Sequence, residues 1–153
     1  MTHFDHTDFL VLTRARLATC TDYPGNELGT HDLLEWEGRV WKPTADVPGD
    51  IYVRELLLPR EEPQTAFGLI TASGRCRYDV FARRGVPLES ARTLQRQIVE
   101  AFGNGVALDA GDFAIDVQRS ERGGGIRASA TSPDWQFLPV SFLWSVHTPT
   151  PSI

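Results

Sequence analysis

Hydrophobic and polar residues alternate with a period of two along two stretches of the chain, residues 69–82 and 135–147. That period places successive side chains on opposite faces of a β-strand. In the first stretch every second residue from Cys76 to Ala82 is apolar or aromatic, and the second stretch repeats the pattern from Leu138 onward. The sequence therefore predicts two long strands, each of which buries one face.

Two other segments have the spacing of an α-helix. Residues 88–102 carry one apolar stripe with steps of three and four, and Gly103-Asn104-Gly105 follows it with residues typical of a helix C-terminus. Pro87 suits the first turn of this helix. Residues 7–19 predict a second, shorter helix at the start of the chain.

The remaining elements complete an α-β-β-α-β-β-β order. Residues 51–58 predict a strand that Pro59 stops, and residues 106–108 and 113–119 predict two short strands. Pro139 lies inside the last strand, which places that strand at a sheet edge or marks a bulge. The order predicts an α+β fold: a mostly antiparallel sheet of four to five strands with two helices on one face.

A long segment after the first helix differs from the rest of the chain. Residues 20–50 contain several prolines and glycines, have no sustained period, and favour at most one turn of helix at residues 31–35. They hold seven acidic and two basic residues, which accounts for the entire net charge of −5. We interpret this segment as irregular, and as either a solvated loop or a functional one.

Length and composition fit one domain over residues 1–153, with residues 148–153 as a flexible tail. No apolar run is long enough to span a bilayer, and the net negative charge argues against a general membrane or nucleic-acid surface. Two cysteines, Cys20 and Cys76, are too few for a disulfide scaffold. These features indicate a reduced cytosolic environment.

No set of residues indicates catalysis. The histidines His3 and His6 lie in a polar start of the chain, and the three glycines at 123–125 lack the Lys-Ser/Thr pair of a phosphate-binding loop. We therefore predict a protein that is not an enzyme and that uses no cofactor and no metal. Trp36 and Trp41, in the irregular segment, either anchor that segment to the body or contact a partner.

The succession of motifs resembles one protein family. A Trp-x-Pro element at residues 41–43 precedes a strand that ends in LLP; then come YDVFA, GVPLESARTLQRQIVEAF and finally WQFLPVSFLW. This series is similar to the tail terminator, or tail completion, proteins of long-tailed phages and prophages. The resemblance covers most of residues 40–147, and residues 20–38 depart from it by their length.

The resemblance implies a structural virion protein at the tail–neck junction, assembled in the host cytoplasm. Such a protein forms a ring with copies of itself, a hexamer in this family. The ring caps the tail tube, ends its polymerisation and docks onto the head–tail connector protein. Its partners are then the tail tube protein and the connector, with transient passage of DNA through the lumen and no membrane.

Two groups of residues are candidates for these contacts. Charged and aromatic residues in the loops are candidates for a subunit or partner interface, namely Arg60, Glu61, Glu62, Phe67, Arg122, Arg127, Trp36 and Trp41. A negative lumen would repel the DNA duplex over about 8 Å at physiological salt. The candidates for lumen-facing acids are Asp22, Glu27, Asp32, Glu35 and Glu37.

Two alternatives stay open. One is a tail tube protein or a head-side neck or connector protein, which is also small and forms rings. The other is a small peptide- or ligand-binding module in which Trp36 and Trp41 form an aromatic wall. The mass in solution separates a ring from a monomer.

Overall fold

The computed structural model describes residues 6–25, 31–42, 47, 49–60, 70–103, 107–110, 113–122, 127–128 and 133–147. The elements along the chain are α1 (His6–Leu17), β1 (Leu34–Glu35), β2 (Ile51–Arg60), β3 (Ile70–Arg83), α3 (Glu89–Ala101), β4 (Ala107–Ala110), β5 (Phe113–Arg122), β6 (Arg127–Ala128) and β7 (Trp135–His147). At residues 31–35, where the sequence favours at most one turn of helix, the structure has a turn followed by the two-residue strand β1.

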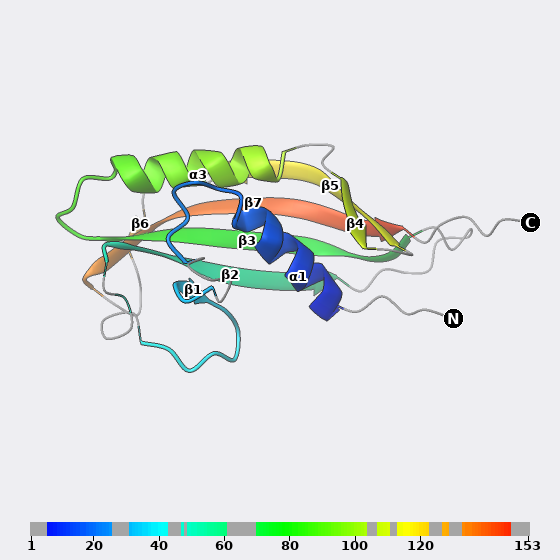
Figure 1. The fold of residues 1–153 in the computed structure, drawn as a ribbon, viewed down its shortest axis with the longest axis horizontal. Helices are drawn as coiled ribbons and strands as arrows, with labels where there is room; N and C mark the ends of the chain where they lie inside the picture. The colour runs from blue at the N-terminus through cyan, green and yellow to red at the C-terminus, as the bar shows by residue number, and fades with distance from the viewer. Residues whose placement is uncertain are drawn as a thin grey trace, which may run out of the picture.

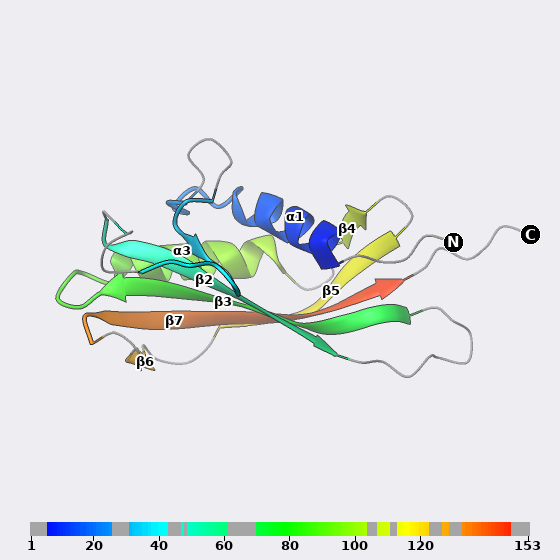
Figure 2. The same cartoon turned by 90° about the horizontal axis from the view of Figure 1, so that it is seen from below.

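One sheet carries both helices on the same side (Figures 1 and 2). Its strand order is β1-β2-β3-β7-β5-β4, and β6 pairs with the free part of β7. All strand pairs of this sheet are antiparallel except β1 and β2, which run parallel. The predicted α+β class, the mostly antiparallel sheet and the two helices on one face are confirmed.

The main core lies between the sheet and the helices. Alternate residues of β3 and β7 point into it, as the period of two predicts. Phe102, directly after α3, stacks on Phe142 of β7 with ring centres 4.5 Å apart and on Tyr78 of β3 at 5.7 Å. Phe9 of α1 meets Trp144 at 4.4 Å. Aromatic contacts therefore join both helices to the central strands.

β2 extends beyond the end that the sequence predicts for it. β2 does not stop at Pro59 but continues to Arg60. The N–H of Val53 donates to Leu33 on the outer side of β2, and backbone direction alternates along a strand. Pro59 therefore turns its missing N–H toward that outer edge, where the ladder with β3 loses nothing.

Pro139 does not mark a sheet edge, since β7 lies in the middle of the sheet. On one side Pro139 faces Asp79 of β3. On the other side β5 ends its register at Val140 and β6 begins at Phe137, so Pro139 falls at the break between two partner strands. At this break the carbonyl of Pro139 faces neither β5 nor β6. The side chain of Gln95 in α3 donates a hydrogen bond to that carbonyl at 3.0 Å in place of a strand partner.

A second, smaller core covers part of the opposite face of the sheet. Tyr52 and Phe81 stack with ring centres 4.6 Å apart, and Trp135 meets Tyr52 edge-on at 4.9 Å. Val47, from the segment before β2, completes this cluster. The face of β3 that holds Asp79 and Phe81 is therefore partly buried, although its polar residues favoured a solvent face.

Candidate interaction surfaces

Residues 31–42, here called the strap, follow the outer edge of β2 and contain a tight turn. The N–H of Arg39 donates to the carbonyl of Trp36 at 3.1 Å, which closes a four-residue turn. Gly38 occupies its third position with φ of 86°, as a type II turn requires. A Cβ on Gly38 would meet nothing within 4 Å, so the backbone conformation alone favours glycine there.

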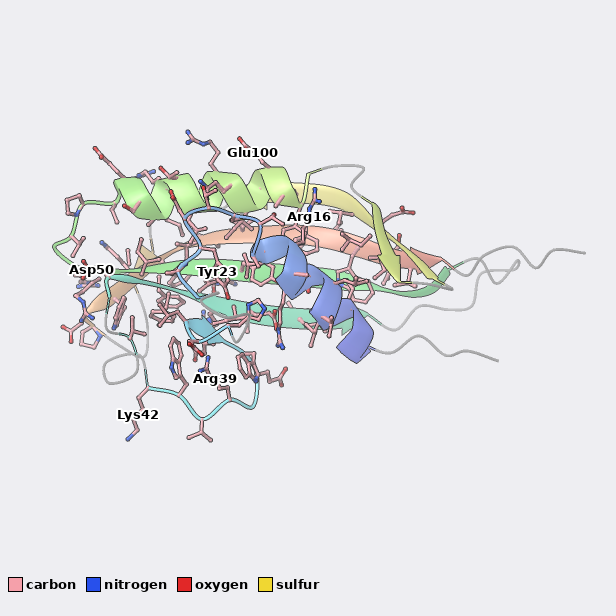
Figure 3. The ribbon with its side chains drawn as sticks, viewed as in Figure 1. Arg16, Tyr23, Arg39, Lys42, Asp50 and Glu100 are labelled. Carbon is pink, nitrogen blue, oxygen red and sulfur yellow. The ribbon has the colours of Figure 1, made fainter. Side chains whose placement is uncertain are left out.

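Arg39 holds the turn at its base. Its guanidinium donates to the carbonyl of Leu34 and, at 3.4 Å, to that of His31. The same group lies 4.4 Å from the ring centre of Trp36 and 5.0 Å from that of Trp41. In Figure 3 Arg39 points back into the strap, whereas Lys42 points away from the body. The turn is thus fixed by hydrogen bonds and two cation–π contacts.

The tryptophans anchor the strap to the body. Trp41 meets Tyr52 edge-on at 4.9 Å, and Arg14 of α1 lies 4.9 Å from the ring centre of Trp36. Both indoles are half-buried. Of the two interpretations of these tryptophans, an anchor to the body or a partner contact, the geometry favours the anchor.

The candidate lumen acids do not form one cluster. Asp32, Glu35 and Glu37 all belong to the strap; the first and last are exposed, and Glu35 is half-buried. Burial raises the pKa of Glu35. Asp22 lies against α3 instead, where its backbone N–H donates to the side chain of Gln97 at 3.0 Å. Glu27 falls outside the described residues.

The other predicted interface residues lie at strand ends or beyond them. The backbone of Arg60 ends β2, that of Arg122 ends β5 opposite Val140, and that of Arg127 begins β6 opposite Phe137. Their side chains are not among those that the structure describes. Glu61, Glu62 and Phe67 lie outside the described residues.

On the sheet face opposite the helices, a group of three side chains lies beyond the second core. Leu58, Arg75 and Leu143 stand opposite one another on β2, β3 and β7, and we call them the open patch. Leu58 is 54% exposed, Arg75 is exposed and Leu143 is half-buried. These three residues were not among the candidates predicted from the sequence. The run Leu56-Leu57-Leu58 was the available signal, because three successive leucines of a strand cannot all face one core.

Further along β3 on the same face, beyond Arg77, Asp79 is completely buried between two arginines. Arg77 donates to it at 2.7 and 3.0 Å, and Arg54 at 2.8 Å. Both guanidiniums also lie within 6 Å of the ring centre of Phe137. The carboxylate is thus paired and hydrogen-bonded, which is what a buried charge requires.

A second buried carboxylate docks α1 on the helix side. Glu55 accepts hydrogen bonds from Arg14 at 2.7–3.2 Å and from the hydroxyl of Tyr78 at 3.2 Å. Burial first, and then the charges of Cys76 and Glu55, raise the pKa of Tyr78. Its hydroxyl therefore stays protonated and donates to Glu55. This network has the geometry of a structural anchor.

Tyr23 and His31 join the start of the strap to the segment after α1. The tyrosine hydroxyl and the Nδ1 atom of His31 are 3.0 Å apart. Burial, and next the positive charge of Arg14, lower the pKa of His31 from 6.5. Since the folded state then binds the proton less tightly than the unfolded state does, stability falls as the pH drops below about 6.5.

Replacing His31 with asparagine tests this pH dependence. Asparagine tolerates the φ of 54° found at this position and cannot take up a proton. We expect the wild type to lose more stability than the variant between pH 7 and about pH 5. Urea unfolding at both pH values measures the difference, and equal losses in the two proteins would contradict the assignment.

The described residues offer few groups for chemistry. Both cysteines are free and buried, and burial raises the pKa of Cys20 to about 11. A thiol of that pKa is a poor nucleophile at neutral pH. Across the described ranges, no three His, Cys, Asp or Glu side chains are placed to hold a metal ion. Neither described helix has the length and hydrophobicity of a membrane span.

Comparisons with known proteins support the fold. The chain matches no family model and no curated protein sequence. It is similar to a solved structure of a protein that is designated only by a sequence number, with a TM-score of 0.67 and 14% identity. The alignment covers 97% of this chain and 99% of that one. At this identity the likeness shows that the two chains share a fold over their whole length.

Proposed function

We propose that the protein is a phage tail terminator, which forms a ring, caps the tail tube and docks the tail to the head connector. The observation that carries the proposal is that the resembling motifs form one packed unit. YDVFA lies in β3, the following motif in α3, and WQFLPVSFLW in β7. Phe102, next to α3, stacks on both Tyr78 of β3 and Phe142 of β7.

The surfaces support a head-to-tail ring. The strap at the outer edge of β2 and the open patch on the sheet face are different surfaces of the same chain. Heterologous contacts between two different surfaces generate a closed ring when the rotation permits. Tail tube, connector and passing DNA are the partners of such a ring, and exposed Asp22 and Asp32 are candidates for its lumen.

The proposal predicts a hexamer at the tail–neck junction. Native mass spectrometry of the purified protein at rising concentration should reveal an assembly of six chains. A reconstruction of virions from a host that carries the gene should place the ring between tail tube and connector. Another symmetry there would contradict the hexamer, and a position along the tube or in the head would favour the tube or neck alternative.

A further inference from the structure

We propose that the turn Trp36–Val40 of one copy docks onto the open patch of the next copy. Glu37 pairs with Arg75, and Val40 packs against Leu58 and Leu143. The inference rests on the proposed ring and identifies the contact that builds it. The occupant of the open patch is thus a second copy of this chain.

The turn Trp36–Val40 is rigid and yet presents its tip to solvent. Arg39 fixes its base through two carbonyls and two indole rings. A contact element that is already ordered loses little conformational entropy on binding. Arg39 points inward, whereas the next residue, Val40, is 98% exposed and Glu37 is exposed.

Both the turn and the open patch expose a large apolar side chain. Among the described residues the large hydrophobic side chains that are exposed are Val11, Val40 and Leu58. Two of these three belong to the turn and the open patch. Leu143 adds apolar surface on the other side of Arg75, although it lies on the central strand of the sheet. Neighbouring strands are about 4.8 Å apart, so the patch spans roughly 10 Å, the width of a tight turn.

The turn and the open patch also carry opposite charges. Four arginines on this sheet face have described side chains: Arg54 and Arg77 bind Asp79, and Arg83 binds Asp50. Arg75 has no carboxylate partner within the described part of the chain. Glu37 likewise has no cation there. One unpaired acid and one unpaired base, each beside an exposed apolar residue, are complementary in both charge and hydropathy.

A charge exchange tests the contact. Glu37→Arg and Arg75→Glu should each weaken assembly by about tenfold or more, because like charges then face each other. The double variant restores an opposite pair at every interface, so it should assemble like the wild type. Glu100→Arg and Arg92→Glu are matched controls, since both residues are exposed on α3. Circular dichroism checks that each variant folds, and sedimentation velocity measures the assembly.

A pair of substitutions that change no charge supplements the charge exchange between Glu37 and Arg75. Val40→Ser should weaken assembly, whereas Val11→Ser, at an exposed position on α1, should not. Rings that form equally well in both single charge variants, or a double variant no better than the singles, would overturn the contact and leave the proposed ring standing. A wild type that stays monomeric in solution and forms no ring at the tail–neck junction of virions would overturn the ring and the contact together.

Discussion

Replacing Phe102 with alanine is expected to lower the free energy of unfolding by about 3–5 kcal/mol. Phe102 is completely buried, and it lies nearly parallel to Phe142 with ring centres 4.5 Å apart. It also stacks on Tyr78. Truncation removes these contacts and leaves a cavity at the point where α3 meets the two central strands. Urea unfolding followed by circular dichroism measures the loss.

Val11→Ala is the matched control for this experiment. Val11 is 63% exposed on α1, so its truncation should change stability by less than about 0.5 kcal/mol. If Phe102→Ala were as mild as Val11→Ala, then Phe102 would not be part of the core.

The second large effect is expected at Asp79. Asparagine has the same shape but no charge, so Asp79→Asn leaves the guanidiniums of Arg54 and Arg77 facing each other. Breaking a buried ion pair costs about 3–5 kcal/mol. We expect the low end, about 3 kcal/mol, because the two arginine side chains are 28% and 29% exposed and water relieves part of the repulsion.

Arg83→Gln is the control for Asp79→Asn, because it breaks an ion pair that is exposed to solvent. Arg83 and Asp50 form a looser pair at 3.4 Å, with exposures of 35% and 57%. Exposed pairs contribute about 0–1 kcal/mol, so this variant should remain close to the wild type. Equal effects of the two substitutions in urea unfolding would contradict the structural role of Asp79.

Periodicity was sufficient to predict the elements that build the core. β3, β7 and α3 each bury the face that their spacing indicates. The effects of Pro59 and Pro139 were predicted wrongly, because a strand tolerates proline wherever no neighbouring strand needs a hydrogen bond from its N–H. The direction in which the backbone at a proline points depends on its register with strands that lie far away in the sequence. Pro59 faces an outer edge, and Pro139 faces the break between β5 and β6.

The candidate surfaces were only partly predictable. Composition drew attention to Trp36, Trp41 and Glu37, because aromatic and acidic residues in an irregular segment are conspicuous. The role of Arg39 was not predictable, since it depends on where the carbonyls of His31 and Leu34 lie after folding. Three different strands contribute the open patch, and it exists only once their register is known.

The position of β7 has a consequence for biosynthesis. β7 pairs with β3 on one side and β5 on the other, and it follows both in the chain. Its register joins Cys76 to Phe142, residues from opposite halves of the sequence. While a ribosome is still making the last strand, β3 has an unpaired edge and the main core lacks its central strand. The central pairing therefore forms only after residue 147 has emerged, and we expect strand pairing at such long range to slow folding.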